Sequence, residues 1–119
     1  MSGLAQKRCV PCEGIGRPLN REEAVKYLEH ISGWQISDDG KFLSRELAMK
    51  NFMAAVRLVN LTSEVAEHEN HHPDFHLTGY RRLRFVLSTH ALGGLTENDF
   101  ILAAKINELP AELKTENAK

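Results

Sequence analysis

Apolar residues recur at helical spacing in three segments of the chain, and each segment has a recognisable start. Asn20 and Thr96 are good N-caps, because their side chains can accept a hydrogen bond from the first turn of a helix. Glu23 and Asp99 stand three residues later and complete a capping box in each case. The spacing therefore predicts three helices, which begin after Asn20, at Asn51 and after Thr96, and which end near Gly33, His71 and Pro110.

Between the helical segments, apolar and polar residues alternate as in half-buried β-strands. Asp-Asp-Gly at 38–40 and Gly79 mark the turns of two hairpins. The expected strands are residues 34–37, 41–48, 75–78 and 82–89. The resulting order, α-β-β-α-β-β-α, predicts an α+β fold with a four-stranded antiparallel sheet and three helices on one face.

A length of 119 residues corresponds to one domain. We expect this domain at residues 19–110, between a flexible N-terminal tail of residues 1–18 and a C-terminal tail of residues 111–119. The N-terminal tail holds one C-x-x-C pair, Cys9 and Cys12. A structural zinc usually needs four ligands, so we expect the pair to be a bystander and the tail to be dispensable for activity. A metal shared across an oligomer and a reversible disulfide are the alternatives.

The composition is that of an ordinary globular protein, with 42% hydrophobic and 26% charged residues. A formal net charge of −1 gives no reason to expect nucleic acid or an anionic membrane as the main partner. No apolar run approaches the ~20 residues of a membrane-spanning helix, and the first residues lack the apolar segment of a signal peptide. We therefore expect a cytoplasmic protein with no membrane and no nucleic-acid partner.

The chemistry of the chain is concentrated in its histidines, because five of the six lie between His68 and His90. Histidine is the side chain best suited to exchange protons near neutral pH. Pro73 disfavours helical backbone at His72, so the adjacent imidazoles of His71 and His72 should project from a rigid helix-to-strand corner. The following hairpin returns the chain, which should bring His90, at the end of the last strand, beside that corner.

A metal site is the main competing interpretation of this cluster. His68 and His72 have the spacing of helical zinc ligands, but the sequence reads H-E-x-H-H and is one residue off the H-E-x-x-H motif. Helical geometry at His72 is also doubtful, because proline follows. We therefore predict no metal, and we expect His68, His76 and His30 to be ordinary structural or surface residues. The potential ligands in the cluster are Glu67, His68, His71, His72, Asp74 and His76.

Glu-x-x-x-His-His-Pro at 67–73 is followed by an aromatic residue, Tyr80, and then by Ser-Thr-His at 88–90. Gly-Leu-Thr-Glu-Asn-Asp occupies 94–99. This set of motifs resembles the pterin-4a-carbinolamine dehydratase family over roughly residues 20–109, and the expected order of helices and strands matches the fold of that family. Phe75 stands where the family often has Trp, and Ala91 stands where it often has an acid.

The resemblance implies the loss of water from a 4a-hydroxytetrahydropterin to give quinonoid dihydropterin. It implies a hydro-lyase that uses no cofactor, since the pterin is the substrate. His71 and His90 would act as acid and base at the 4a-hydroxyl, and His72 would orient the pterin. Glu67, one helical turn before His71, would hold the ring of His71. The implied substrate-binding residues are Pro73, Thr89, Ala91, Leu92, Glu67 and Phe75.

The resemblance also implies a homodimer or homotetramer, and a four-stranded sheet with bare edges favours the same expectation. The reaction implies a functional link to a pterin-dependent aromatic amino-acid hydroxylase. The alternative is a pterin-binding or dimerisation protein of the same fold with a coactivator-type regulatory role, or one linked to molybdopterin metabolism. We favour the enzyme, because His71, His72 and His90 are all present.

Overall fold

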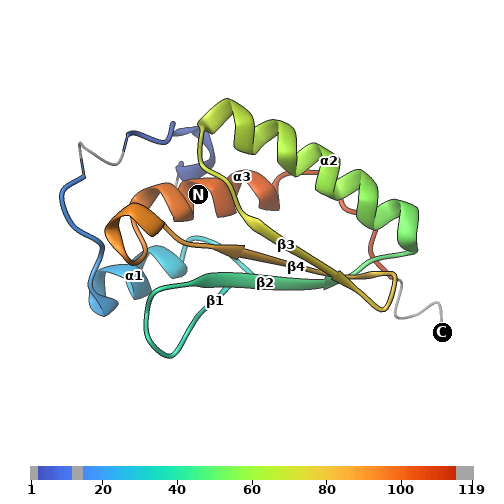
Figure 1. The fold of residues 1–119 in the computed structure, drawn as a ribbon, viewed down its shortest axis with the longest axis horizontal. Coiled ribbons are helices and arrows are strands. Elements are labelled where there is room, and N and C mark those ends of the chain that lie inside the picture. The colour runs from blue at the N-terminus through green and yellow to red at the C-terminus, as the bar shows by residue number, and fades with distance from the viewer. Residues whose placement is uncertain (1–2, 12–14, 115–119) are drawn as a thin grey trace.

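The computed structural model describes residues 3–11 and 15–114 as an α+β domain. A four-stranded antiparallel sheet has the order β1-β2-β4-β3, and the helices cover one of its faces (Figure 1). The predicted fold class and the order α-β-β-α-β-β-α are therefore confirmed. The elements are α1 (Arg21–Leu28), β1 (Gln35–Ile36), β2 (Leu43–Ala48), α2 (Phe52–Glu69), β3 (Asp74–Thr78), β4 (Arg82–Leu87) and α3 (Glu97–Asn107), with short 3-10 helices η1 (Leu4–Gln6) and η3 (His90–Leu92).

The helices begin where their capping residues predict. The Asn20 side chain accepts a hydrogen bond from the Glu23 amide at 2.9 Å, and the Glu23 carboxylate accepts one from the Asn20 amide at 2.9 Å. The Asn51 side chain accepts from the Ala54 amide at 2.8 Å. Such caps satisfy backbone donors that a helix start leaves unpaired, and each contributes about 1 kcal/mol.

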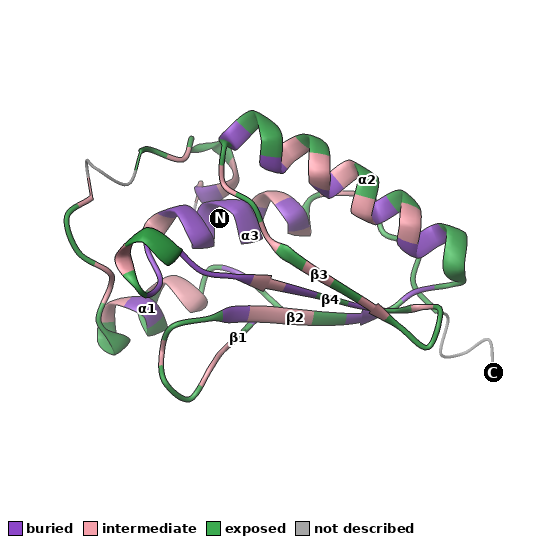
Figure 2. Cartoon of the chain, viewed as in Figure 1, coloured by how far each residue is buried: buried purple, intermediate pink, exposed green. Residues whose placement is uncertain are grey.

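The core lies between the sheet and the helices. Along β4, Leu83, Phe85 and Leu87 are completely buried, whereas Arg82 and Arg84 on the other face are exposed (Figure 2). α3 is buried on most of its surface and forms the centre of the helical layer. A slip of one residue would turn every inward side chain of β4 outward, so this stripe fixes the register of the sheet.

Among the described residues no helix is long and apolar enough to cross a membrane.

Part of the segment predicted to be a flexible tail packs against the domain. Leu4 is only 4% exposed and belongs to the core. The Lys105 ammonium on α3 donates a hydrogen bond to the Ala5 carbonyl at 2.7 Å. The sequence did not indicate this contact, because one buried leucine in a short segment has no periodicity. Residues 3–10 are therefore part of the folded structure, and Cys12 lies outside the described residues.

The chain after α3 also contacts the sheet. The Lys50 amide donates to the Glu112 carbonyl at 2.8 Å, and the Lys114 amide donates to the Ala48 carbonyl at 2.9 Å. Residues 112–114 thus pair with the chain at the end of β2, although the sequence predicted a tail from residue 111. The rest of that predicted tail, residues 115–119, lies outside the described residues.

Candidate active site

The end of α2 sets the position of His71. The sequence predicts a helix end near His71, but the helix ends at Glu69, because Asn70 adopts left-handed backbone with φ 54° and ψ 41°. Asparagine is one of the few residues other than glycine that adopt this conformation readily. The His71 amide still donates to the Ala66 carbonyl at 3.2 Å, so His71 stays attached to the last turn. Pro73 then directs the chain into β3.

The His71 ring is bonded to a buried carboxylate. Its Nε2 lies 2.6 Å from Oδ1 of Asp99, in the first turn of α3. The His71 side chain is 10% exposed and that of Asp99 is completely buried. An ionised carboxylate can only accept hydrogen bonds, so this pairing favours a hydrogen on Nε2 and leaves Nδ1 to exchange a proton with a bound molecule.

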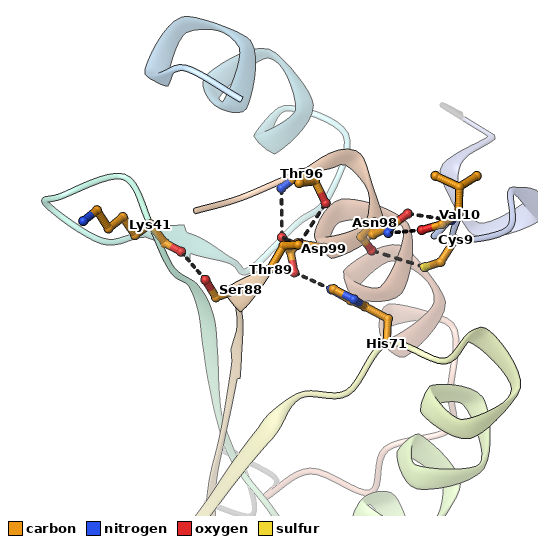
Figure 3. Close-up of polar contacts among 9 residues, drawn as sticks. All are labelled: Cys9, Val10, Lys41, His71, Ser88, Thr89, Thr96, Asn98 and Asp99. Carbon is orange, nitrogen blue, oxygen red and sulfur yellow. Dashed lines mark hydrogen bonds and ion pairs between the residues drawn. The ribbon is translucent and has the colours of Figure 1, made fainter. Parts of the chain in front are cut away.

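The second carboxylate oxygen of Asp99 is also fully engaged. It accepts from the Thr96 amide and from the Thr89 hydroxyl, both at 2.9 Å (Figure 3). The two threonine hydroxyls lie 2.9 Å apart. Asp99 therefore caps α3, as the sequence predicts, and also holds His71, which the sequence analysis missed. The sequence feature that could have indicated this contact is Asp99 itself, an acidic capping residue inside the Gly-Leu-Thr-Glu-Asn-Asp motif at 94–99.

His72 has a different carboxylate partner. Its Nε2 lies 2.6 Å from Oε2 of Glu67. Both side chains are exposed, at 53% for His72 and 78% for Glu67. The expectation that Glu67 holds His71 is therefore wrong: because the helix stops at Glu69, the chain turns and brings His72 over Glu67 instead. Solvent screens this exposed pair, so its contribution to stability is small.

His90 reaches the same corner, as the hairpin geometry predicts. β4 ends at Leu87, two residues earlier than the sequence predicts, and the chain continues into η3. The Thr89 amide donates to the Gly94 carbonyl at 2.9 Å, which closes the loop around η3. A cavity of about 200 Å³ lies between η3 and the corner, and it is lined by Asn70, His71, His72, Ser88, Thr89, His90 and Ala91.

Other expected site residues lie outside this cavity. Phe75 packs edge-on against Phe85, with ring centroids 5.7 Å apart, so it contributes to the core. Pro73 and Leu92 do not line the cavity. His76 lies on β3 opposite Arg84, on the exposed side of the sheet.

A second cavity adjoins the first. It has a volume of about 520 Å³ and shares Asn70, His71 and Ala91 with the smaller one. His68, which the sequence analysis took for an ordinary residue, lines this second cavity. Residues 8–11, from the segment that was expected to be a tail, also line it.

No group of three or more His, Cys, Asp or Glu side chains within residues 3–11 and 15–114 has the geometry to hold a metal ion. Burial, followed by the nearby Glu69 carboxylate, raises the pKa of the Cys9 thiol to about 12. Cys9 is thus a protonated thiol at neutral pH, whereas metal binding and nucleophilic attack both need the thiolate.

Comparisons with known proteins identify the family of this chain. The family model described as pterin 4 alpha carbinolamine dehydratase matches residues 17–109. This chain belongs to the pterin 4 alpha carbinolamine dehydratase family. The match includes both histidine motifs and the first turn of α3, so the family shares the segments that build the cavity.

Several relatives are similar over nearly the whole chain. A putative pterin-4-alpha-carbinolamine dehydratase of Halorhodospira halophila is 43% identical and covers 91% of this chain, which spans 98% of that protein. The mitochondrial pterin-4-alpha-carbinolamine dehydratase 2 of Arabidopsis thaliana is 41% identical over 94% of this chain, which spans 62% of that protein. A crystal structure of a transcriptional coactivator/pterin dehydratase from Brucella melitensis aligns with a TM-score of 0.71 and 31% identity, over 76% of this chain and 96% of that one.

Proposed function

We propose that this protein removes water from a 4a-hydroxytetrahydropterin to give quinonoid dihydropterin, with histidines as the acid and the base. Membership of the family supports the reaction. The observation that carries the assignment to residues is that His71, His72 and His90 line one cavity of about 200 Å³. These three side chains come from two segments that meet only in the folded chain.

The reaction needs two proton transfers. The departing 4a-hydroxyl must gain a proton to leave as water, and N5 must lose its proton as the C4a–N5 double bond forms. Imidazoles can perform both transfers near neutral pH, and such catalysis typically contributes about a hundred- to ten-thousandfold. We assign the two transfers to His71 and His90, and exchange with water would reset the pair after each turnover.

The Asp99 carboxylate suits His71 to this role. Its hydrogen bond to Nε2 at 2.6 Å holds the ring in one orientation, with Nδ1 as the exchangeable position. The carboxylate also stabilises the imidazolium that forms when His71 accepts a proton. Asp99 is a positioning residue in this scheme, since it acts through His71.

His72 is assigned to pterin binding. It is more exposed than His71, and its ring is bonded to the exposed Glu67 carboxylate, at the rim of the site. Thr89 and Ala91 line the same cavity, so they are the implied contacts from η3. The chemistry needs no cofactor beyond the pterin substrate, and the reaction would return the pterin of an aromatic amino-acid hydroxylase to use.

We also propose that the protein is a homodimer or homotetramer in the cytoplasm. β3 is an edge strand, and Phe52 and Met53 on α2 are 48% and 55% exposed. Unpaired strand edges and exposed apolar side chains are surfaces that a second copy can cover. A regulatory role as a dimerisation partner is the alternative function, because the Brucella melitensis structure is described as a coactivator as well as a dehydratase.

The direct test supplies purified protein with a 4a-hydroxytetrahydropterin that a hydroxylase generates in the same vessel. We expect quinonoid dihydropterin to form much faster than in the spontaneous reaction, and treatment of the protein with a chelator that is removed before the assay to leave this rate unchanged. A rate equal to the spontaneous one would contradict the proposed activity. A rate that this treatment abolishes and that zinc added back to the treated protein restores would contradict the histidine-only chemistry.

A further inference from the structure

Residues 8–10, which we call the N-terminal strap, bridge the end of α2 and the start of α3. The Cys9 amide donates to Oε1 of Glu69, the last residue of α2, at 2.8 Å. The Val10 amide donates to Oδ1 of Asn98, in the first turn of α3, at 3.0 Å, and Nδ2 of Asn98 donates back to the Val10 carbonyl at 2.7 Å (Figure 3). Two consecutive amides of the strap therefore bind the two helices.

Both anchors of the strap are buried polar side chains. The side-chain oxygen and nitrogen of Asn98 both bond to the backbone of Val10. The second carboxylate oxygen of the buried Glu69 lies 3.2 Å from Nε of Arg8. A buried polar group that loses its partner costs free energy, so these bonds favour the docked strap. The side chain of Val10 is itself exposed, so the strap is held through its backbone.

The two anchors are next to the residues of the His71–Asp99 pair. Glu69 precedes His71 by two residues, and Asn98 directly precedes Asp99. Consecutive residues have Cα atoms about 3.8 Å apart, so the strap keeps its two anchors close together. The contact between Nε2 of His71 and Oδ1 of Asp99, at 2.6 Å, spans the same junction of α2 and α3. A hydrogen bond weakens steeply when its partners separate or turn, so the pair depends on how closely this junction is held.

A second contact between the two helices lies further from the pair. The Lys105 ammonium is 3.6 Å from Oε2 of Glu69. Lys105 stands in the last turn of α3, whereas Asp99 stands in the first. This ion pair therefore restrains the later part of α3, and the strap restrains the turn that carries Asp99.

We infer that the N-terminal strap positions the His71–Asp99 pair, and that Asn98 is a positioning residue for the dehydration. The inference rests on the proposed function, in which Asp99 orients the ring of His71. By holding the end of α2 against the start of α3, the strap keeps the Asp99 carboxylate on Nε2 and leaves Nδ1 as the exchangeable position. The strap thus supports turnover although it supplies no acid or base, contrary to the expectation that residues 1–18 are dispensable for activity.

Val10→Pro tests the inference from the side of the strap. Proline has no amide hydrogen, so this variant loses the bond to Oδ1 of Asn98 without a change in α3 itself. We expect kcat to fall about tenfold with little change in KM, because small displacements of positioned groups are costly to catalysis. Asn98→Ala, which loses both bonds to Val10, should lose more. Val10→Ala keeps both backbone bonds and is the matched control, with kcat expected to stay at the wild-type value.

A double-variant experiment shows whether the effect acts through the pair. In an Asp99→Asn background, Val10→Pro should lower kcat by less than about twofold, because groups that act as a unit are not additive. An undiminished loss in that background would overturn the inference. An equal loss of kcat in Asn107→Ala would also overturn it. That variant removes an asparagine bonded to Trp34 and Ser32 at the far end of α3, so its loss would reflect general destabilisation of the helix.

NMR provides a measurement that does not depend on turnover. A hydrogen on Nε2 of His71, bonded to the buried Asp99 carboxylate, should give a downfield resonance that exchanges slowly with water. Val10→Pro should speed this exchange about tenfold, whereas Val10→Ala should not. A wild type that shows this response but does not dehydrate would contradict the proposed function and support the positioning role. Unchanged exchange in both Val10→Pro and Asn98→Ala would overturn the positioning role and leave the proposed function intact.

Discussion

Asp99 and His71 are 28 residues apart in the chain, yet Oδ1 of Asp99 lies 2.6 Å from Nε2 of His71. One carboxylate thereby joins the start of α3 to the corner after α2. Its other oxygen accepts from Thr89 and Thr96, so the aspartate is fixed on both sides. The orientation of the His71 ring thus depends on a residue that does not itself line the histidine cavity.

The first prediction concerns this pair. Asp99→Asn should lower kcat about a hundredfold and change KM little, because His71 loses the carboxylate that orients its ring and stabilises its charged form. The pH profile of kcat should shift as well, which loss of a merely structural contact would not produce. Steady-state kinetics between pH 5 and 9 measure both effects.

Glu97→Gln provides the control for that variant. It makes the same chemical change in the same helical turn, but Glu97 bonds to Lys7 on the surface. A similar loss of kcat in both variants would show that the helix start, and not the bond to His71, is responsible.

His72 should behave differently from His71. His72→Ala should raise KM more than it lowers kcat, because a group that only binds acts on the ground state and the transition state alike. Glu67→Gln should produce the same effect more weakly, since the exposed Glu67 only orients the ring. A fall in kcat with unchanged KM would instead place His72 among the acid–base groups.

Glu69 should make stability depend on pH. Burial alone would raise the pKa of this carboxyl, but the hydrogen bond from the Cys9 amide and the charge of Lys105 outweigh burial and lower the pKa below its ordinary value. A group with a lowered pKa stabilises the fold above its unfolded pKa, and that contribution is lost as pH falls through the folded value. Glu69→Gln should therefore lower the free energy of unfolding by about 1–3 kcal/mol at pH 7.

Chemical denaturation at pH 7 and below pH 4 checks this expectation, because the difference from the wild type should shrink in acid. Glu64→Gln removes an exposed carboxylate from the same helix and should change little at either pH. A difference for Glu69→Gln that is the same at both pH values would contradict the account of Glu69.

The Cys9 thiol should be unreactive in the folded protein. A rise in its pKa from 9.0 to about 12 lowers the thiolate fraction at pH 8 about a thousandfold. In a Cys12→Ser variant, alkylation by iodoacetamide should thus be slow in the native state and fast in denaturant. Equal rates would show that Cys9 is accessible and ionised, and would support the redox interpretation of the cysteine pair.

Local signals explain why so much of the fold is predictable from the sequence. The capping residues Asn20, Asn51 and Thr96 mark the helix starts, and the alternation of apolar and polar residues along residues 82–87 marks the buried face of β4. Each of these signals depends on residues within a few positions of one another. The hairpin return of His90 follows from the same kind of reasoning, because antiparallel pairing is geometrically simple.

The missed features depend on distant contacts or on a single backbone conformation. The partner of Asp99 could not be deduced, because nothing in the sequence says which side chain faces the start of α3. Glu67 was expected to contact His71 because a helix that continued to His71 would place the two residues one turn apart. The left-handed backbone of Asn70 ends the helix before His71. The packing of residues 8–11 depends on hydrogen bonds from this segment to the side chains of Glu69 and Asn98. Because the bonded residues are far apart in the chain, no local sequence pattern indicates these contacts.

The central claim is that His71 and His90 transfer the protons. The most direct measurement is the single-turnover dehydration rate of His71→Ala, of His90→Ala and of the double variant. Each single variant should lose about a hundred- to ten-thousandfold, equivalent to about 3–5 kcal/mol of barrier, with pterin binding nearly unchanged. The double variant should lose less than the product of the two losses, because both groups act in one step. His76→Ala, on the exposed side of β3, should keep full activity; single variants of His71 and His90 that also keep it would contradict the account.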